Sequence, residues 1–472
     1  MKLRKHITAA LFAAAMLTSV CAAPCMAAEP LFPTVQPVSE ETASFYETWK
    51  DKYLTQDSYI TGDAQYYVWY SGESYTSYPV AVTVSEAHGY GMLITACMAG
   101  HDPEAKEIFD GLYRYYRAHL SEVGPNLMAW QQEDNGSAIV NASGADSASD
   151  GDMDIAYALL LADSIWGSDG EINYKQTALD MLSDIMEYEV NQTDWIIQLG
   201  DWAVWSEEGD PYYAATRASD FLVQYMPVFA AASGDDRWMN VYESTYAIIN
   251  GFVEEYQTGL LPDFIVKDES GAFVPAEEYF LESENDGNYY YNSCRIPWRI
   301  SMDYLINGNE EALAFAQTIT EFMQKDSGGD AWEIKAGYTP EGTAVESYND
   351  LCFTAPFLVA AACTDETEWH DEVRSVVLNY GEDVYYGDTI KMLCLIADDG
   401  AWPVPEDGEG ADGLSGDVNL DGKVSVADAV LLRKYLVKLE TLTQEQMKNA
   451  DVCTDGTVNV YDLAALKTLL LE

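Results

Sequence analysis

Basic residues are scarce in this chain. Its 472 residues include 24 Lys and Arg against 79 Asp and Glu, and the formal net charge is −55. Binding to nucleic acid or to an anionic membrane surface requires clustered cationic side chains, so this balance argues against both partners. The surplus of carboxylates suits the solubility of an exported protein, and it would also suit a cationic substrate or bound cations.

Closely spaced cysteine pairs and long apolar runs are also missing. Only six cysteines lie beyond residue 28, and they are widely separated, with no CxxC pair. This excludes a dense disulfide framework and a cysteine-rich zinc site, and it predicts that most of these thiols pack in the core. Beyond the N-terminal segment no apolar run is long enough to span a bilayer, so no membrane helix is predicted.

The N-terminal segment has the composition of an export signal. Three basic residues within positions 2–5 precede an apolar stretch over 7–20, and small residues follow. This order is typical of a secretory signal peptide, which we predict to occupy residues 1–27. The mature protein is therefore expected to be secreted and extracellular, either free or held at a cell surface.

Helical patterning dominates the rest of the chain, whereas strand-like alternation is scarce. Apolar residues recur at helical spacing most clearly in YKQTALDMLSDIMEYEV and EEALAFAQTITEFMQ. Long loops rich in Tyr, Trp, Asp and Gly separate the helices, and such loops on a helical scaffold usually carry function. The predicted helical segments lie near 40–53, 86–100, 103–119, 152–166, 172–190, 217–232, 236–257, 295–307, 309–325, 349–363, 369–379 and 388–397.

A linker divides the chain into two parts. Residues 400–416 are rich in Pro, Gly and acidic side chains, which is typical of a connection between domains. We therefore expect a large domain over 28–399 and a small one over 417–472. The small domain contains an internal duplication, because GDVNLDGKVSVADAVLLRKYL aligns with ADVCTDGTVNVYDLAALKTLL.

Each half of the duplication begins with a twelve-residue loop of the form D-x-[DN]-x-[DN]-G. This spacing directs oxygen atoms toward one point, as a Ca2+ ion requires, and Gly422 and Gly456 stand where the chain must turn sharply. Cys453 occupies the third position of the second loop, where a thiol is a poor calcium ligand, so that site is expected to be weaker or completed by water. The candidate ligands are Asp417, Asn419, Asp421, Lys423 (through its carbonyl), Ser425 and Asp428, and then Asp451, Asp455, Thr457 (through its carbonyl), Asn459 and Asp462.

A helix is predicted after each loop, but no helix precedes the first loop as it would in an EF-hand. This arrangement resembles a type I dockerin, the module that attaches enzymes to the cohesins of a cellulosome scaffold, and the resemblance covers the whole tail. It implies two bound Ca2+ ions and a cohesin partner that contacts Val426, Ala427, Val460 and Tyr461. The alternative is a calcium-binding domain without such a partner.

Three aspartates crowd the start of one predicted helix in the large domain. Asp150, Asp152 and Asp154 fall within ASDGDMDIAYALLLADSIW, residues 148–166. The helix dipole stabilises acidic groups at a helix N-terminus, so capping alone would account for a lone D-x-D. The whole stretch, however, matches A-[ST]-D-[AG]-D-x-x-I-A-x-A-L-L-x-A-x-x-x-W at every position, and it resembles the signature of glycoside hydrolase family 8.

Two further stretches support this resemblance. VSEAHGYGML (84–93) is similar to the family's S-E-G-Q-x-Y-G-M motif, with Ala87 and His88 in place of Gly and Gln, and NSCRIPWRISMDYL (292–305) is similar to its R-x-P-W-R helix. The resemblance spans about 40–399. It implies an all-α fold, an (α/α)6 barrel, with a monomeric catalytic domain, no catalytic cofactor and inversion at the cleaved linkage. Inversion requires one carboxyl group to protonate the leaving oxygen and a second to activate water on the opposite face.

The resemblance also assigns roles to residues. Glu86 is the implied proton donor, and Asp150 matches the residue that binds the sugar at the cleavage point. The usual base position holds Asn292, which cannot take a proton; a second branch of the family has Asn there and a Glu on an upstream loop, which corresponds to Glu282, with Glu284 as the alternative. The residues expected to bind the glycan are Tyr90, Trp130, Arg295 and Trp298; packing is the alternative for each, and for Trp298 packing is favoured.

These residues together predict an extracellular, endo-acting, inverting hydrolase of β-1,4-linked glycans. Members of the branch with Asn act on chitosan, mixed-linkage β-glucan or cellulose. A dockerin-like tail favours plant-wall β-glucan, the acidic composition favours chitosan, and xylan belongs more to the other branch. The alternative from another class is a catalytically silent glycan-binding subunit, which would keep aromatic platforms but would need no acid–base pair.

Overall fold

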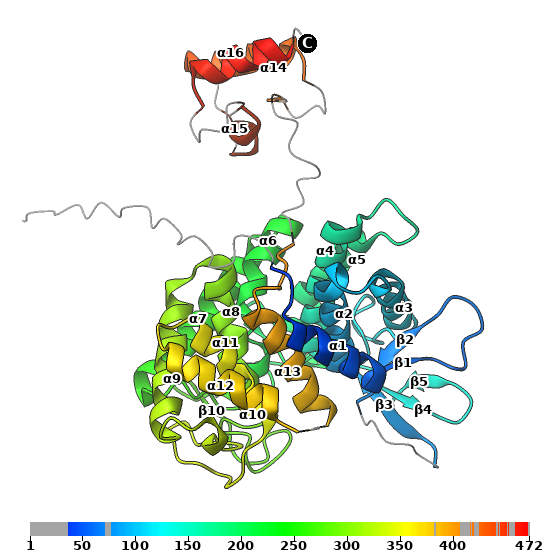
Figure 1. Cartoon of the computed structure of the whole chain (residues 1–472), viewed down its shortest axis with the longest axis vertical. Coiled ribbons are helices and arrows are strands. Elements are labelled where there is room, and N and C mark those ends of the chain that lie inside the picture. Colours follow the sequence, from blue (N-terminus) through cyan, green and yellow to red (C-terminus); the bar gives the residue numbers. More distant parts are fainter. Residues whose placement is uncertain are drawn as a thin grey trace, which may run out of the picture.

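The computed structural model describes residues 36–70, 77–381 and 384–405 continuously, and parts of the C-terminal tail (Figure 1). The described tail residues are 416, 418–419, 424–439, 442, 444–450, 452 and 458–470. Several predicted features lie outside the described residues: the signal peptide over 1–27, most of the linker, the calcium positions Asp417, Asp421, Lys423, Asp451, Asp455 and Thr457, and the side chains of Val426 and Tyr461.

Helices make up most of the described chain, and the strands are short. The helices are α1 (Glu40–Tyr53), α2 (Ser85–Cys97), α3 (Ala105–Ala118), α4 (Ser149–Trp166), α5 (Tyr174–Asp184), α6 (Met226–Ser233), α7 (Arg237–Tyr256), α8 (Ile296–Asn307), α9 (Glu310–Asp326), α10 (Leu351–Thr354), α11 (Pro356–Ala362), α12 (Thr367–Asn379), α13 (Tyr385–Asp398), α14 (Val426–Leu436), α15 (Gln444–Ala450) and α16 (Val460–Leu469). The strands are β1 (Leu54–Gln56), β2 (Tyr66–Val68), β3 (Val80–Val84), β4 (Gln131–Asp134), β5 (Ile139–Asn141), β6 (Val190–Asn191), β7 (Ile196–Ile197), β8 (Ala215–Arg217), β9 (Phe264–Lys267) and β10 (Phe273–Pro275).

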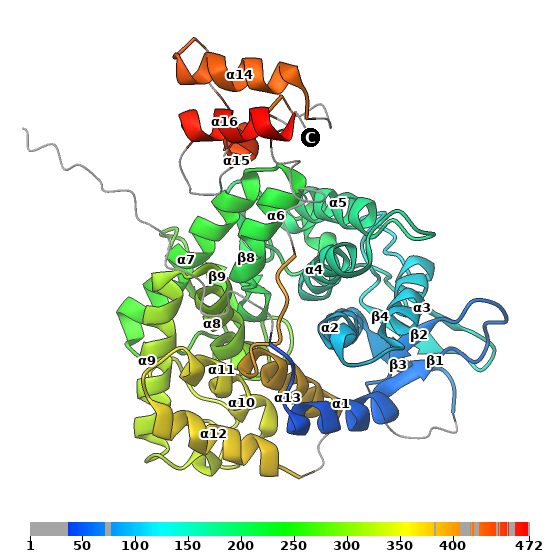
Figure 2. The same ribbon diagram turned by 45° about the horizontal axis from the view of Figure 1, so that its top comes forward.

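The large domain is built from two concentric rings of helices. The inner helices are buried on nearly every side, as in α4, where every residue from Ser149 to Ala162 is buried. The outer helices bury one face only, as in α7, where Trp238, Val241 and Phe252 are buried and the polar residues between them are mostly exposed. In Figure 2, α2, α4, α8, α11 and α13 lie inside a ring that includes α1, α3, α5, α7, α9 and α12. The predicted (α/α)6 barrel is therefore confirmed.

The first and last helices of the barrel pack together and close the ring. Trp49 of α1 donates from Nε1 to Oγ1 of Thr389 on α13 at 2.9 Å, and the Lys52 ammonium forms an ion pair with Asp388 at 2.9 Å. Beyond the end of α13, the carbonyl of Gly400 accepts a hydrogen bond from the backbone N–H of residue 36 at 2.9 Å. The two ends of the barrel domain therefore meet at one seam.

Two glycines allow α2 and α4 to approach closely. A Cβ atom on Gly151 of α4 would lie 2.6 Å from both the carbonyl carbon and Oγ of Ser85, and one on Gly89 of α2 would lie 2.8 Å from Cβ of Asp154. Side chains at these glycines would therefore force the two helices apart. Because Ser85 and Gly151 each adjoin a candidate catalytic carboxylate, this contact sets the separation of the two acids.

The strands form small antiparallel sheets at the loops. They pair as β1–β2, β3–β4–β5, β6–β7 and β8–β9–β10. In the second of these sheets, Val84 pairs with Gln131, which brings the end of β3 and the start of α2 beside the segment that contains Trp130. The sheets therefore hold loops against the ends of the inner helices.

Two predicted helices differ from the structure. The segment predicted over 217–232 becomes helical only at Met226, because residues 215–217 pair with β9 and two short 3-10 turns follow. The segment predicted over 349–363 is divided into α10 and α11, with Pro356 at the first position of α11. Proline lacks an N–H and clashes with the preceding helical turn, so it starts a helix more readily than it continues one.

The tail has a separate small core. Val418, Leu432 and Leu466 are fully buried and come from the first loop, α14 and α16 respectively. The start of α14 is a capping box, in which Ser425 and Asp428 each accept a backbone N–H from the other end of the first turn. Among the described residues, the helices all fall short of the length and apolarity that crossing a bilayer requires.

Candidate active site

Three inner helices bring Glu86, Asp150 and Arg295 together at their N-terminal ends. Glu86 and Asp150 are the second residues of α2 and α4, and Arg295 immediately precedes α8. The guanidinium of Arg295 donates from Nη1 to Oε2 of Glu86 at 2.6 Å and to Oδ2 of Asp150 at 3.0 Å. One cation therefore bridges two carboxyl groups that are distant in sequence.

A second arginine repeats this arrangement one turn deeper in the barrel. Arg299 donates from Nη2 to Oδ2 of Asp154 at 3.0 Å and to the hydroxyl of Tyr90 at 3.0 Å. The same hydroxyl accepts from Nη1 of Arg295 at 3.0 Å. The helices α2, α4 and α8 thus each contribute two residues four positions apart, which lie on one helix face. These two layers fix the three helices relative to one another.

The surroundings shift the pKa values of the Glu86 and Asp150 carboxyl groups in opposite directions. Burial raises the pKa of Glu86 against the opposing effect of Arg295, and the charge of Asp150 raises it further. Burial also acts to raise the pKa of Asp150, but the guanidinium groups of Arg295, Arg217 and Arg299 outweigh it and hold that pKa below its usual range. The geometry therefore favours a protonated Glu86 beside an ionised Asp150.

The two oxygens of the Glu86 carboxyl group have different neighbours. Oε1 accepts a hydrogen bond from the hydroxyl of Tyr385, the first residue of α13, at 3.1 Å, and 20% of the Glu86 side chain is exposed. Oε2 faces Arg295, which has only donors and cannot accept a proton. A proton on Glu86 therefore resides on Oε1, beside Tyr385.

Of the two candidate bases, Glu282 is linked to the site. Its Oε2 accepts a hydrogen bond from Nδ2 of Asn292 at 2.9 Å, and Oδ1 of Asn292 accepts from Nη2 of Arg295 at 3.3 Å. Glu282 is exposed, so water can reach its carboxylate. Glu284 is also exposed, but its side chain makes no hydrogen bond or ion pair with any other residue that the structure describes.

Two buried aspartates hold the loop that carries Glu282. Asp286 accepts hydrogen bonds from the backbone N–H groups of Leu281, Glu282 and Ser283 at 2.7–2.9 Å. Asp263 accepts from the backbone N–H groups of residues 290, 292 and 293 at 2.7–3.0 Å, and burial raises its pKa to about 6. Both ends of the loop are therefore pinned, which fixes the direction of Glu282.

Arg217 places Glu282 and Asp150 in one electrostatic environment. Burial acts to lower the pKa of Arg217, but the carboxylates of Asp220, Asp150 and Glu282 together raise it. Asp220 is itself fully buried, and burial raises its pKa to about 7 despite the neighbouring Arg217. Arg217 is therefore a second cation, besides Arg295, that lowers the pKa of Asp150.

The predicted glycan contacts require correction. Trp130 is 40% exposed, and its carbonyl accepts the N–H of Ser85 at 2.8 Å, so an accessible indole lies beside the start of α2. Tyr90 and Trp298 are completely buried, and Arg295 is 1% exposed. A side chain without accessible surface cannot stack on a sugar, so the prediction is wrong for Tyr90 and Trp298, because they belong to inner helices. Arg295 contacts protein carboxylates instead.

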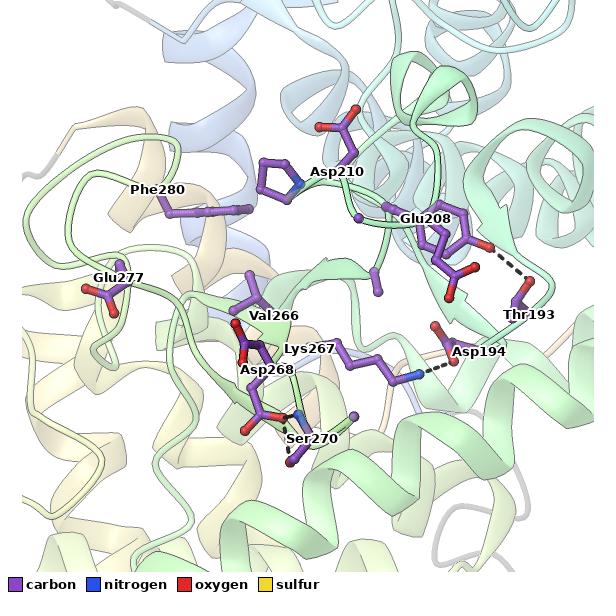
Figure 3. Close-up of a pocket in the computed structure, with 16 residues that line it drawn as sticks. Thr193, Asp194, Glu208, Asp210, Val266, Lys267, Asp268, Ser270, Glu277 and Phe280 are labelled. Atoms are coloured by element: carbon purple, nitrogen blue, oxygen red, sulfur yellow. Dashed lines mark hydrogen bonds and ion pairs between the residues drawn. The ribbon is translucent and has the colours of Figure 1, made fainter.

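A cavity of about 820 Å3 lies beside the Glu282 loop, between β9, the residues around Glu208 and the turn at Asp268 (Figure 3). Its lining is acidic, and Lys267 is paired within it to Asp194 at 2.5 Å. Phe280 of the loop forms one of its walls. The lining includes none of the candidate catalytic residues, so this cavity is not the reaction centre.

In the tail, the described calcium positions at the end of each loop accept hydrogen bonds from the backbone of that loop. Oδ1 of Asp428 accepts the backbone N–H of Asn419 at 2.9 Å, which joins positions 12 and 3 of the first loop. Oδ2 of Asp462 accepts the N–H of Asn459 at 2.7 Å in the second. Both aspartates are buried. Ala427 is exposed and Val460 is 64% exposed, so these two predicted cohesin contacts are accessible.

Sequence reasoning missed Tyr385, Asp263 and Asp286. Tyr385 lies three residues before the predicted start of its helix, and the pair of tyrosines at that helix start was the available signal. Asp286 lies in the recognised acidic loop, but nothing in its spacing separates an anchor from a solvated acid. Asp263 follows an apolar turn and carried no signal.

Comparison with known proteins agrees with this geometry. The profile of Glycosyl hydrolases family 8 matches residues 25–400, and that of the Dockerin type I domain matches residues 415–471. The chain is 44% identical over 360 residues to a Beta-glucanase of Niallia circulans, covering 76% of this chain and 83% of the relative. It is 35% identical over 374 residues to an Endoglucanase of Bacillus sp. (strain KSM-330), covering 77% of each.

A solved structure is also similar. The apo structure of Beta-1,3-1,4-glucanase from Paenibacillus sp. X4 is 41% identical, with a TM-score of 0.71, and the match covers 79% of this chain and 98% of that one. The fold, the motifs and the extent of these matches agree. The chain therefore belongs to glycoside hydrolase family 8 and carries a type I dockerin domain at its C-terminal end.

Proposed function

We propose that this enzyme is a secreted, endo-acting β-glucanase that cleaves β-1,4 linkages with inversion, using Glu86 as general acid and Glu282 as general base. The observation that carries the proposal is the path from one carboxyl group to the other. Glu282 accepts from Asn292, Asn292 accepts from Arg295, and Arg295 donates to Glu86. This hydrogen-bonded path supports pairing the two acids in one site, as an inverting mechanism requires.

In the proposed reaction, Glu86 gives the proton on Oε1 to the glycosidic oxygen as the bond from that oxygen to the anomeric carbon breaks. Glu282 takes a proton from a water molecule, and the resulting hydroxyl attacks the anomeric carbon from the other face. The ionised Asp150 stays fixed by Arg295 and favours positive charge that develops on the sugar. Each turnover leaves Glu86 ionised and Glu282 protonated, and exchange with water restores both.

The proposed substrate is β-glucan, either mixed-linkage glucan or cellulose. The support is that relatives above 40% identity are named Beta-glucanase and Beta-1,3-1,4-glucanase. The exposed indole of Trp130 next to the acid suits stacking on a glucose ring. Reducing-end release from barley β-glucan, carboxymethylcellulose, chitosan and xylan, compared at equal enzyme concentration, tests this assignment. The largest kcat/KM on chitosan or xylan would overturn it.

The acid and base assignments are tested by matched Glu→Gln variants. Acid or base catalysis is worth about 10²- to 10⁴-fold, so Glu86→Gln and Glu282→Gln should each lose activity on that scale. Glu284→Gln has the same change two residues away and should retain wild-type kcat. NMR of the first product should show the inverted anomer. An active Glu282→Gln together with an inactive Glu284→Gln would refute the base assignment, and activity in Glu86→Gln would refute the mechanism.

We further propose that export uses a signal peptide over 1–27 and that the tail over 417–472 binds a cohesin of a cellulosome scaffold. Two Ca2+ ions are proposed, held by the loops that end at Asp428 and Asp462. The support is the dockerin match and the accessible side chains of Ala427 and Val460. A Val460→Asp variant should lose cohesin binding without losing hydrolysis, and unchanged binding would overturn this contact.

A further inference from the structure

A second pair of acidic residues lies beneath the active site and has no part in the proposed reaction. Asp152 and Glu189 are both completely buried. Asp152 is in the first turn of α4, two residues after Asp150, and Glu189 ends the short π-helical turn Ile185–Glu189 that follows α5. The turn that ends at Glu189 packs against α4, and the carboxyl group of Glu189 raises the pKa of Asp152.

One oxygen of each carboxyl group already has a donor, and the other has none. Oδ1 of Asp152 accepts the backbone N–H of Met128 at 2.8 Å, and Oε1 of Glu189 accepts the hydroxyl of Ser147 at 2.5 Å. Oδ2 of Asp152 and Oε2 of Glu189 are buried and have no donor among the described residues. If both groups were ionised, these two oxygens would be left as buried, unsatisfied charges. A single proton between them satisfies both.

The groups that face this pair are themselves acidic. Asp201 lies close enough to act on both members, and Asp220 acts on Glu189. Asp201 accepts hydrogen bonds from the N–H of Ser147 at 2.8 Å and from the hydroxyl of Ser121 at 2.5 Å, so its own acceptors are occupied. The arginine ion pairs of α4 go to Asp150 and Asp154, and among the described residues no arginine or lysine forms one with Asp152 or Glu189. The pair therefore lacks a countercharge and needs a proton instead.

The pair connects elements that carry site residues. Through Met128 it holds the segment that continues to the exposed Trp130, and through Ser147 it holds the turn before α4. The same turn is fixed by Ser149, which donates to the carbonyl of residue 198 at 2.7 Å. Asp150 lies between these attachments, in the first turn of α4. Ionisation of both members would place two charges side by side where that turn is anchored.

We infer that Asp152 and Glu189 share one proton and act together as a positioning pair that fixes the start of α4, and with it Asp150, only while that proton is bound. This inference goes beyond the proposed function, since it depends neither on Glu282 as base nor on the identity of the glycan. It predicts an alkaline limit to stability that is separate from the ionisation of Glu86.

The direction of the pH effect follows from proton linkage. Burial is the largest cause that raises the pKa of Asp152 well above its usual range, and the charge of Glu189 is the next. Burial also raises the pKa of Glu189 to about 8. The folded protein then binds this proton more tightly than the unfolded chain. The stabilisation is complete below the ordinary pKa of a carboxyl group and is lost as the pH rises toward about 8.

The test is the melting temperature of the full-length protein between pH 5 and pH 9, for wild type, Glu189→Gln and Glu187→Gln. The amide that Glu189→Gln introduces supplies a permanent donor toward Asp152, so most of the wild-type decline with rising pH should disappear. Glu187 is exposed on the same turn, and its variant should keep the wild-type decline. Infrared spectra at neutral pH should show a protonated-carboxyl absorption that is weaker in Glu189→Gln than in wild type, because one of the protonated carboxyl groups is lost.

Asp152→Asn gives the same comparison if Glu189→Gln fails to fold, because it keeps an acceptor for Met128 and supplies a donor to Glu189. The kcat profile of the variant that folds should extend to higher pH than that of wild type, with KM unchanged. A wild-type pH decline that survives in both Glu189→Gln and Asp152→Asn would overturn the inference. Failure of the proposed function would appear differently, as hydrolysis by Glu86→Gln or Glu282→Gln with the melting curves unaffected.

Discussion

Asn292 donates a hydrogen bond from Nδ2 to Oε2 of Glu282 at 2.9 Å. The same Nδ2 group lies 3.3 Å from Oδ2 of Asp263, so the amide lies between two carboxylates. An aspartate at position 292 would serve as the base in the other branch of the family, but here its side chain would have no donor for either neighbouring carboxylate. The side-chain amide of Asn292 therefore helps to orient the Glu282 carboxylate.

Asn292→Asp should lower kcat and should not restore a base. Three carboxyl groups would then share one site without a donor between them, and like charges at contact distance disfavour ionisation. The expected result is a loss of at least about tenfold in kcat with an acidic limb displaced to higher pH, measured on barley β-glucan. Asn285→Asp makes the same change elsewhere in the loop, where Oδ1 only accepts from Asn288 and keeps that role, so it should retain activity. A kcat equal to or above wild type in Asn292→Asp would contradict this prediction.

Tyr385→Phe should move the alkaline limb of the kcat profile to higher pH. The Tyr385 hydroxyl stabilises the ionised form of Glu86 and so lowers its pKa, although burial keeps that pKa raised overall. Without the hydroxyl, Glu86 holds its proton to higher pH, and the loss of one hydrogen bond costs about 0.5–1.5 kcal/mol. Tyr304→Phe, near the far end of α8, is the matched control and should leave the profile unchanged. An alkaline limb that moves to lower pH would show that the hydroxyl stabilises protonated Glu86 instead, and would contradict this prediction.

Gly151→Ala should reduce both stability and activity. The new Cβ would lie 2.6 Å from backbone and side-chain atoms of Ser85, which forces α2 away from α4. Overpacking of this kind costs about 1–3 kcal/mol. The separation of Glu86 and Asp150 changes with it, so kcat should fall more than KM rises. Gly251→Ala on α7 adds the same methyl group where no atom lies within 4 Å, and it should raise the melting temperature slightly because alanine favours helix.

Removal of Ca2+ with EDTA should affect cohesin binding but not hydrolysis. Calcium loops of this type fold with their metal, so EDTA should abolish binding to a cohesin in calorimetry, and added Ca2+ should restore it. Hydrolysis of soluble β-glucan by the same sample should continue, because the proposed reaction uses only side chains of the barrel. Cohesin binding that survives EDTA would contradict the proposed calcium sites.

Much of the site could be predicted from the sequence, because its main acids lie at the starts of helices within long motifs. The motifs predict that Glu86 and Asp150 share one site, and the two residues meet around Arg295. Spacing alone could not distinguish Glu282 from Glu284 as the base, because both lie in one acidic loop. In the structure, Asp286 holds the backbone of this loop, and the Glu282 side chain is the one that reaches Asn292.

The errors have a common physical cause. Trp298 and Tyr90 are candidate sugar platforms by residue type, but α8 and α2 are inner helices whose side chains are covered on all sides. An aromatic side chain in such a helix packs in the core, whereas Trp130, in a loop before β4, keeps a free face. Whether an aromatic side chain is exposed therefore depends more on the place of its helix in the barrel than on its residue type.

The orientation of α13 in the seam with α1 determines where the tail joins the barrel. Tyr385, at the first position of α13, touches Glu86, whereas residues 398–400 end that helix at the opposite side of the barrel and lead into the linker. The tether therefore leaves from the side facing away from the groove. Substrate can therefore approach Glu86 without passing the point where the tail is attached to the barrel.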